Sequence, residues 1–435
     1  VPTSNTPGAT FNWTRAAVMG ISNSARTDTG RINEALSNTT ANPINVVYQY
    51  TATANGCTSP TPTNVTVIVN PSATLSSTLT PPAICSGTAF MYTPTSTNTN
   101  ATFSWTRALV NGLSNAAASG TAGINETLIN TTADTLSVVY LYTISATGCS
   151  DPNPTRVTVL VKPRPVLSSA TNPPAICSGS AFSYTPTSAT EGTTFAWTRA
   201  AVAGISNAAA NGTGNPNETL FDTTTGPVTA TYLYTLSAYG CTNPIPDTVK
   251  VVVNRPPSLS SSTTPADVCS RALFSYIPTS TTVGTTFSWT RAAVTGISNA
   301  AANGTDDPLE SLINTSNAPV SVTYAYTLNA NGCINPQIFN VVVVVKPSPT
   351  LSSSLTPPAI CSGNVFNYTP TSAATGASFA WIRASVNGIS NPEADGVGNP
   401  NETLVNTTAA AINVIYRFTV SAGGCTNPTA SNVVV

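Results

Sequence analysis

The segment Phe103-Ser104-Trp105-Thr106-Arg107 decides the fold, because it alternates apolar with polar side chains and returns at a fixed interval. Its tryptophan recurs every 92 residues without insertion or deletion, at Trp13, Trp105, Trp197, Trp289 and Trp381. An interval of about 90 residues is too long for one unit of a solenoid, but it suits a small domain that folds by itself. The 435 residues therefore consist of one module repeated in tandem.

The repeat predicts five modules, which we number along the chain. Their bounds are residues 1–70, 71–162, 163–254, 255–346 and 347–435. Val1-Pro2-Thr3-Ser4 aligns with Thr93-Pro94-Thr95-Ser96, so module 1 lacks the 22 residues that open the other modules, and module 5 lacks its last 3. We expect either that the chain is a slice of a longer protein or that a neighbouring chain supplies the missing strands.

The sequence of module 2 predicts a series of short strands. Alternating or β-branched runs occur at Phe90–Thr93, Thr102–Arg107, Leu136–Ile144 and Arg156–Val161, and a shorter run occurs at Thr74–Leu79. Such runs are typical of strands with one buried face. About seven short strands separated by turn residues favour an all-β module, an antiparallel β-sandwich of immunoglobulin-like type.

Each module ends in a strand that runs directly into a proline, as in Val161-Lys162-Pro163 and Val345-Lys346-Pro347. Proline fixes the backbone angle φ, which makes short linkers semi-rigid. The tandem array is therefore expected to form an elongated rod.

The composition limits both the partners and the compartment. Only 7% of the residues are charged, there is no histidine, and 15 basic residues balance 16 acidic ones. This near-neutral chain gives no electrostatic reason to bind nucleic acid, and it has no apolar run long enough to insert into a membrane. Because a cytosolic protein normally has about a quarter charged residues, we expect an extracellular or cell-surface, secreted protein.

Catalytic and metal-binding patterns are missing from the sequence. Without histidine, a general base would have to be a carboxylate or a lysine, and only one carboxylate recurs in every module. Glycoside hydrolysis needs two carboxylates, and a zinc site needs histidines or closely spaced cysteines. We therefore predict no enzyme activity, no catalytic residue, no metal site and no cofactor.

An arginine and a glutamate recur in all five modules. Arg107 shares a strand face with Phe103 and Trp105, so its charge leaves the edge of the core and needs an acceptor. Glu126 is the recurrent carboxylate. The predicted structural ion pairs are Arg15–Glu34, Arg107–Glu126, Arg199–Glu218, Arg291–Glu310 and Arg383–Glu402. The alternative is that these pairs engage a ligand or a neighbouring chain.

Two cysteine series also follow the repeat. Cysteines 64 residues apart, with the tryptophan 20 residues after the first, match the Cys, Trp, Cys order of immunoglobulin domains. This order predicts disulfides within modules: Cys85–Cys149, Cys177–Cys241, Cys269–Cys333 and Cys361–Cys425, with Cys57 left over. The alternative joins cysteines across each linker, such as Cys57 with Cys85 and Cys149 with Cys177. Either scheme implies an oxidising compartment.

The module resembles the PKD-like repeats of very large Bacteroidota surface proteins. The resemblance rests on Phe-Ser-Trp-Thr-Arg-Ala, Gly-Ile-Ser-Asn, Asn-Glu-Thr-Leu, Tyr-x-Tyr-Thr, Gly-Cys-Thr-Asn-Pro and Pro-Pro-Ala-Ile-Cys-Ser-Gly. The Trp-Asp-Phe-Gly-Asp-Gly motif of the PKD domain proper is lacking. The resemblance implies a protein exported by type IX secretion whose modules form a stalk or filament for adhesion or gliding. It also implies O-glycosylation in Asp-Thr-apolar sites, at Thr135, Thr223 and Thr248.

Two functions follow from these observations. The first is structural: the array is a stalk or filament-forming segment whose partners are neighbouring copies, packed end to end or laterally through exposed loop residues such as Ser114 and Asn115. The alternative is a multivalent array that binds surface glycans with avidity. Glycan binding predicts an exposed aromatic or polar patch that all modules share, whereas we predict that Trp105 and Tyr140 lie in the core.

Overall fold

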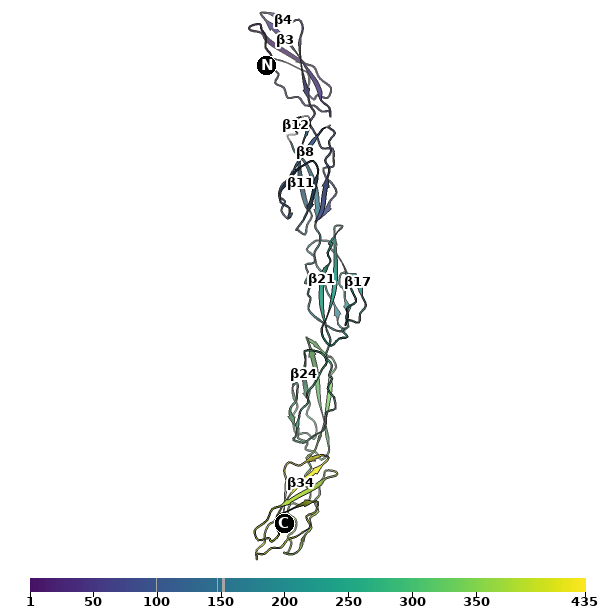
Figure 1. The fold of residues 1–435 in the computed structure, drawn as a ribbon, viewed down its shortest axis with the longest axis vertical. Helices are drawn as coiled ribbons and strands as arrows, with labels where there is room; N and C mark the ends of the chain where they lie inside the picture. Colours follow the sequence, from purple (N-terminus) through teal and green to yellow (C-terminus); the bar gives the residue numbers. More distant parts are fainter. Residues whose placement is uncertain (99, 147, 151–152) are drawn as a thin grey trace.

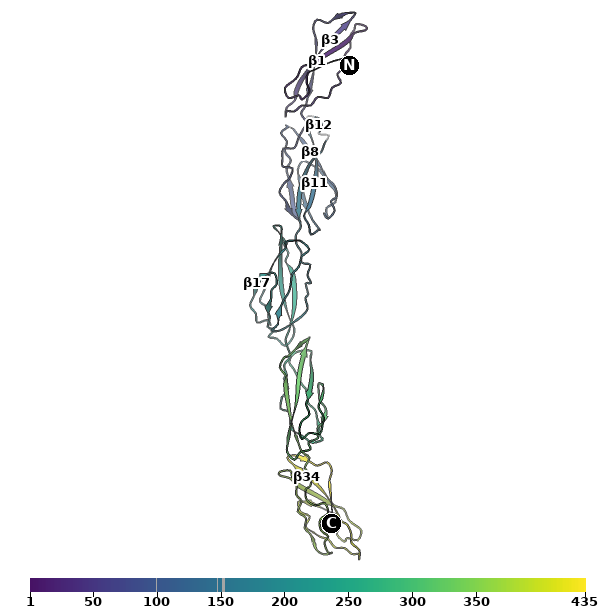
Figure 2. The ribbon, with the colours of Figure 1, turned by 180° about the vertical axis from the view of Figure 1, so that it is seen from behind.

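The computed structural model describes residues 1–98, 100–146, 148–150 and 153–435, and these residues contain strands but no helix. Pro152, a proline shared by all modules, lies outside the described residues. The modules follow one another in a long rod whose first and last modules lie at opposite ends (Figures 1 and 2). The predicted all-β, rod-like array is confirmed.

Module 2 shows the architecture of a complete module. Its strands are β6 (Ile84–Cys85), β7 (Thr88–Tyr92), β8 (Thr102–Arg107), β9 (Ala118–Thr121), β10 (Ile124–Leu128), β11 (Leu136–Ala146), β12 (Cys149–Ser150) and β13 (Thr155–Lys162). The larger sheet has the order β6-β13-β11-β8-β9, with β12 paired to β11, and β7 pairs with β10 in a second sheet. The pairs are antiparallel except β6 with β13, which is parallel.

Modules 3 and 4 repeat this topology, and module 5 repeats it without an equivalent of β6. Module 3 has β14 (Ile176–Cys177), β15 (Ala181–Phe182), β16 (Thr194–Arg199), β17 (Ala210–Thr213), β18 (Glu218–Thr219), β19 (Val228–Ala238), β20 (Cys241–Thr242) and β21 (Asp247–Asn254). Module 4 has β22 (Val268–Cys269), β23 (Leu273–Phe274), β24 (Thr285–Arg291), β25 (Ala302–Thr305), β26 (Glu310–Ser311), β27 (Val320–Ala330), β28 (Cys333–Ile334) and β29 (Phe339–Lys346). Module 5 has β30 (Val365–Phe366), β31 (Ser378–Arg383), β32 (Ala394–Val397), β33 (Glu402–Thr403), β34 (Ile415–Ala422), β35 (Cys425–Thr426) and β36 (Ser431–Val434).

Module 1 contains the larger sheet alone. Its strands are β1 (Thr10–Arg15), β2 (Arg26–Thr29), β3 (Ile44–Ala54), β4 (Cys57–Thr58) and β5 (Thr63–Val69). They pair in the order β2-β1-β3-β4, with β5 on β3. Residues 1–70 are all described, and they form no second sheet.

The core of each sandwich is built on the tryptophan strand. In β8, Trp105 and Arg107 are buried and Thr106 between them is exposed, as the alternation predicts. Trp105 lies opposite Tyr142 of β11, and Tyr140 lies two residues earlier on the same buried face. The indole of Trp105 covers Gly120, where an added Cβ would come within 2.7 Å of the ring. In modules 2 to 5 the absence of a side chain at this position leaves room for the indole.

The expected first strand at Thr74–Leu79 is reduced to an isolated bridge between Leu75 and Ser96. The segment bonds first to the residues that follow β7 and then to β13, rather than following one strand. Ser76 N donates to the Thr95 carbonyl at 2.7 Å, whereas the Leu79 carbonyl accepts from Thr158 N on β13 at 2.8 Å. Because its hydrogen bonds go to two different partners, it forms no continuous ladder.

Candidate functional site

An arginine, a glutamate and a tyrosine form a buried cluster in each module. In module 2 the Arg107 guanidinium donates two hydrogen bonds of 3.0 Å to the two carboxylate oxygens of Glu126. The Tyr140 hydroxyl donates a further bond of 2.5 Å to this carboxylate. Arg107 also donates to the Ala116 carbonyl at 2.6 Å. The structure contains all the predicted pairs: Arg15–Glu34, Arg107–Glu126, Arg199–Glu218, Arg291–Glu310 and Arg383–Glu402.

The cluster fixes the protonation of its members. Burial and the hydrogen bond to Glu126 raise the pKa of Tyr140 well above its ordinary value, and the same causes raise the pKa of Tyr48 in module 1 to about 12. Burial opposes ionisation of Glu126, but the hydrogen bonds from Arg107 and Tyr140 outweigh it and lower the pKa of this carboxyl. A neutral hydroxyl therefore faces a carboxylate and a guanidinium throughout the neutral pH range.

The burial of the cluster favours a structural role over ligand binding. The Arg107 side chain is 1% exposed and the Glu126 side chain 17% exposed, and their charges neutralise each other. The loop residue Asn115 is also used within the module, since its amide nitrogen donates to the Thr127 carbonyl at 2.8 Å and its oxygen accepts from Ile129 N at 2.9 Å. These shared polar residues hold the sandwich together.

The two cysteines of a module lie at its opposite ends. In module 2, Cys85 lies beside Lys162, the last residue of β13, because β6 and β13 are parallel. Cys149 lies on β12, which pairs with the end of β11 and precedes β13. The 8 residues of β13 separate these ends by about 25 Å, whereas a disulfide requires Cα atoms within about 7 Å. A bond between Cys85 and Cys149 is therefore not possible.

A tight hairpin presents the second cysteine to the preceding module. In module 3, β19 and β20 are joined by Tyr239 and Gly240, which both have positive φ, 53° and 79°. Two such residues make the type I′ turn that suits the twist of a two-residue hairpin. The turn places Cys241 at the end of module 3 that faces module 2.

The disulfides consequently join successive modules. They are Cys85–Cys241, Cys177–Cys333 and Cys269–Cys425, each with Cα atoms 5.6 Å apart. The pairs predicted within modules, Cys85–Cys149, Cys177–Cys241, Cys269–Cys333 and Cys361–Cys425, are wrong, and so is the alternative scheme of Cys57 with Cys85 and Cys149 with Cys177. Cys57, Cys149 and Cys361 have no disulfide partner and are exposed.

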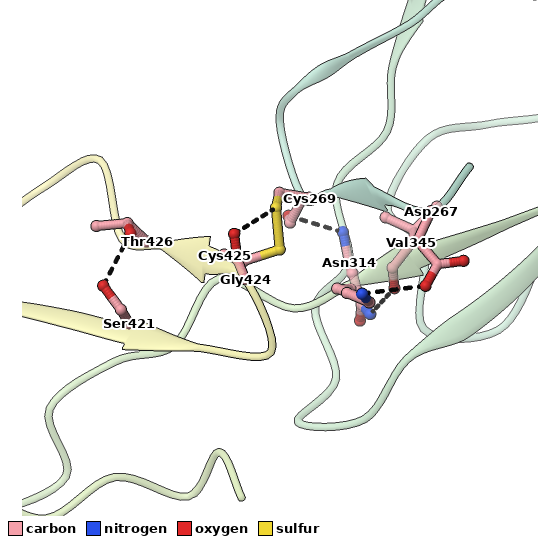
Figure 3. The surroundings of a disulfide bond; sticks show 10 residues. Asp267, Cys269, Asn314, Val345, Ser421, Gly424, Cys425 and Thr426 are labelled. Atoms are coloured by element: carbon pink, nitrogen blue, oxygen red, sulfur yellow. Dashed lines mark hydrogen bonds and ion pairs between the residues drawn. A yellow bond between two sulfur atoms is a disulfide. The ribbon is translucent and has the colours of Figure 1, made fainter. Parts of the chain in front are cut away.

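Polar contacts hold each bonded cysteine in place, as Figure 3 shows for Cys269. Asn314 N donates to the hydroxyl of Ser270, the next residue, at 3.0 Å, and the Asn314 amide donates to the Val345 carbonyl at 2.7 Å. Asp267 forms an ion pair of 3.0 Å with Lys346. The short strand β22 is therefore fastened to the end of β29 before the disulfide crosses to module 5.

Further hydrogen bonds cross the junctions. The Lys162 ammonium donates to the Tyr239 carbonyl at 2.9 Å, and the Asn254 amide donates to the equivalent carbonyl of Asn331 at 3.1 Å. Val283 N of module 4 donates to the Thr225 carbonyl of module 3 at 3.2 Å. The junctions of module 2 with 3 and of module 3 with 4 thus have a peptide linker, a disulfide and additional polar contacts, which together resist bending.

The disulfide loops overlap, because each spans 156 residues while the repeat is 92. The covalent path from Cys85 to Cys425 crosses one disulfide to Cys241, follows 28 residues to Cys269, and crosses a second disulfide. These 28 residues already traverse modules 3 and 4, along β21 and the opening segment of module 4. Fully extended they reach about 95 Å, against roughly 80 Å for two folded modules.

The predicted glycosylation residues Thr135, Thr223 and Thr248 are all exposed. The Thr223 hydroxyl donates to the Gly204 carbonyl at 3.1 Å, so it is already engaged within the module. Among the described residues, no group of three or more Cys, Asp or Glu side chains lies close enough to hold a metal ion. The described part of the chain also has no helix of the length and apolarity needed to span a membrane.

The fold and the junctions define a tandem array of immunoglobulin-like β-sandwiches. The chain belongs to the family of PKD-like domains, whose sequence pattern matches residues 1–73, 82–165, 266–349 and 358–435. This match confirms the resemblance to PKD-like repeats.

Several solved multidomain structures are similar to the chain at low identity. An I-band fragment of titin is 9% identical with a TM-score of 0.29, and the match covers 63% of this chain and 98% of the fragment. Sidekick-1 immunoglobulin domains 1–5 are 11% identical with a TM-score of 0.25, and the match covers 98% of this chain and 91% of the Sidekick-1 chain. Drosophila OTK extracellular domains 3–5 are 12% identical with a TM-score of 0.24, covering 62% and 94%. No curated protein matches the chain.

Proposed function

We propose that the chain is an extracellular stalk or filament segment of a large bacterial surface protein, and that its disulfide-bonded modules transmit tension in adhesion or gliding with little lengthening. The observation that carries the proposal is the disulfide connectivity, because each bond joins a module to the next one. Neighbouring copies, packed end to end or laterally, are the proposed partners. Export by type IX secretion and glycosylation at the exposed Thr135 and Thr248 belong to the same proposal.

The overlapping loops support this role physically. When an ordinary module of 92 residues unfolds under force, it releases roughly 300 Å of chain. Between Cys85 and Cys425, the covalent path through the disulfides contains so few residues that modules 3 and 4 can lengthen by only about 15 Å together. An oxidised array therefore resists extension even where the sandwiches themselves are marginally stable.

The buried aromatic side chains give glycan binding no comparable support. Sugar-binding surfaces use exposed aromatic rings, but Trp105 is 7% exposed and Tyr140 is fully buried. Contacts with surface glycans therefore stay a prediction of the repeat alone.

Single-molecule force spectroscopy tests the proposal, with the full chain pulled from its two ends. Residues 1–84 lie outside every disulfide loop, so the oxidised chain should show one large unfolding step, from module 1. The triple variant Cys85→Ser, Cys177→Ser and Cys269→Ser should add four further steps of roughly 300 Å. The matched control, Cys57→Ser with Cys361→Ser, removes no disulfide and should keep the single step. Five large steps in the oxidised chain contradict the proposal.

A further inference from the structure

The second sheet of module 4 has exposed apolar side chains on its outer face. Leu273 on β23 is 60% exposed, Ile277 is 73% exposed, and Leu309 beside β26 is 59% exposed. Burial alternates along residues 273–277, where Phe274 and Tyr276 are buried in the core. Leu273 and Ile277 therefore lie on the same outer face of this segment.

Leu309 lies on the neighbouring segment. Phe274 is opposite Glu310 in the pair of β23 with β26, so Leu309, the residue before Glu310, comes beside Ser275. Asp307 holds the two segments together here, because its carboxylate accepts a hydrogen bond from the Ser275 hydroxyl at 2.5 Å. Leu309 thus lies between the other two apolar residues, and the three form an apolar strip about 13 Å long.

The apolar strip is specific to module 4. The equivalents of Leu273 are the smaller residues Ala89, Ala181 and Val365, those of Ile277 are Thr93, Thr185 and Thr369, and those of Leu309 are Asn125, Asn217 and Asn401. The other complete modules therefore form the same sheet with a more polar outer face.

Two residues of this face have a backbone conformation that suits other side chains. Leu309 has a φ of 46° where modules 3 and 5 have asparagine, and Arg271 has a φ of 71° where modules 2, 3 and 5 have glycine. Asparagine and glycine adopt this left-handed region more easily than leucine or arginine. Local folding therefore accounts for neither side chain, whereas a contact outside the module accounts for both.

The apolar strip has opposite charges at its two ends. Arg271 lies two residues before the start of β23, and Asp306 lies at the other end, since its neighbour Asp307 accepts a hydrogen bond from Tyr276 N at 2.8 Å. Both charged residues are exposed, and neither takes part in the ion pairs that the described part of module 4 contains. Modules 3 and 5 have glycine at both positions.

We propose that this face of module 4 binds the same face of module 4 in a second copy of the chain, with the two rods antiparallel. A two-fold interface places one patch against its own equivalent. In the antiparallel arrangement Arg271 of each copy meets Asp306 of the other, and the two apolar strips cover each other. A parallel arrangement places like charges together and is disfavoured.

This inference rests on the lateral packing of copies in the proposed function, and it names the surface for that packing. Two strips of three side chains bury less than about 1,200 Å² in total, which is the low end for specific interfaces. Single chains should therefore associate weakly, with a Kd on the order of 100 μM. Copies held side by side in a filament associate more readily, because their effective concentration is higher.

Sedimentation equilibrium of the full chain, with its free thiols alkylated, tests the inference at up to about 500 μM, where the dimer should predominate. The variant Ile277→Thr with Leu309→Asn gives module 4 the side chains of its neighbours and should weaken dimerisation at least about tenfold. Hydrogen exchange of β24 should stay unchanged, which shows that module 4 still folds. The matched control, Ile334→Thr, removes a 61% exposed isoleucine from the larger sheet and should leave the dimer intact.

Charge variants test the antiparallel arrangement. Arg271→Asp makes both ends of the apolar strip acidic, and Asp306→Arg makes both ends basic. Each variant alone should therefore dimerise at least about tenfold more weakly than the native chain. An equimolar mixture of the two should associate as well as the native chain, because every end then meets the opposite charge.

Three results overturn the inference: a native chain that stays monomeric at the highest concentration, a dimer that survives Ile277→Thr with Leu309→Asn, and a mixture of the charge variants that does not associate. None of them affects the proposed resistance to extension, since force spectroscopy measures that property on single chains. Failure of the two proposals can thus be distinguished.

Discussion

Modules 1 and 2 have closely similar sequences but different degrees of closure. In module 1 the larger sheet is present except for an equivalent of β6, Trp13 is 1% exposed, and Arg15 bonds to Glu34 at 2.7 Å. Residues 32–36 nevertheless form no strand, whereas their equivalents in module 2 form β10 against β7. The larger sheet and the ion pair thus form without the second sheet, while closure of the core depends on the opening segment.

This difference separates two sources of stability. The arginine, the tyrosine and the tryptophan lie on the larger sheet, the glutamate reaches them from the facing segment, and every module has this cluster. The rings of β7 belong to the opening segment, and they close the other side of the sandwich. A substitution should therefore affect both modules or only one, depending on the source it removes.

The largest effect is expected from Phe90→Ala, which should make module 2 resemble module 1. Phe90 is 2% exposed, and loss of a buried phenylalanine costs about 3–5 kcal/mol of unfolding free energy. Hydrogen exchange of β13 should then approach that of β5. The matched control is Met91→Ala on the same strand, since Met91 is 75% exposed and should cost less than about 0.5 kcal/mol. Unchanged exchange in β13 would show that β7 does not close the core.

The next largest effect is expected from Glu126→Gln. It should lower the free energy of unfolding by about 3 kcal/mol near neutral pH, because it leaves the buried Arg107 charge unpaired. The folded state lowers the pKa of Glu126 from its ordinary value of 4.5, so the stability from this carboxylate is present above that pH and is lost as the pH falls through the lowered pKa. The difference in unfolding free energy between the native chain and the variant, measured by hydrogen exchange in module 2, should therefore become smaller below about pH 4.5.

The same substitution in module 1, Glu34→Gln, tests whether the cluster is common to both modules. The pKa of Glu34 is also lowered, chiefly by its hydrogen bond from Arg15. Hydrogen exchange in module 1 should show that the difference in stability between the native chain and this variant also becomes smaller as the pH falls. A loss in module 2 alone would contradict the view that the cluster acts without the second sheet.

The smallest effect is expected from Gly120→Ala. It should lower the free energy of unfolding of module 2 by about 1–3 kcal/mol, because the added Cβ would lie within 2.7 Å of the Trp105 ring. Module 1 has Asp28 at the equivalent position, opposite Trp13 on β2. Asp28→Gly should therefore change the stability of module 1 by less than about 0.5 kcal/mol, since the carboxylate is 43% exposed. Hydrogen exchange of β8 and β1 would measure the two changes; equal losses would refute this role of the glycine.

The strands and the core could be predicted because they depend on neighbouring positions in one strand, and the ion pairs could be predicted because each module has one recurrent arginine and one recurrent carboxylate. Alternation in Thr102–Arg107 assigns Trp105 and Arg107 to one face, and a buried arginine needs the recurrent carboxylate. The first strand was overestimated because the alternation of Thr74–Leu79 does not show that its hydrogen bonds go to two separate segments, at Thr95 and at Thr158.

The disulfide connectivity could not be predicted from the spacing of the cysteines. It depends on the end of the module at which each cysteine lies, and the parallel pairing of β6 with the end of β13 decides this for Cys85. One signal was present in the sequence: Gly240-Cys241 follows the long strand β19 directly, as expected for a hairpin tip. A cysteine at that tip lies a full strand away from the end of its own module.

Peptide mapping of the native chain under non-reducing conditions tests the central claim most directly. With free thiols blocked before digestion, the predicted result is three linked peptide pairs, Cys85–Cys241, Cys177–Cys333 and Cys269–Cys425. Linked pairs within a module, such as Cys85 with Cys149, would contradict the claim that the disulfides join successive modules.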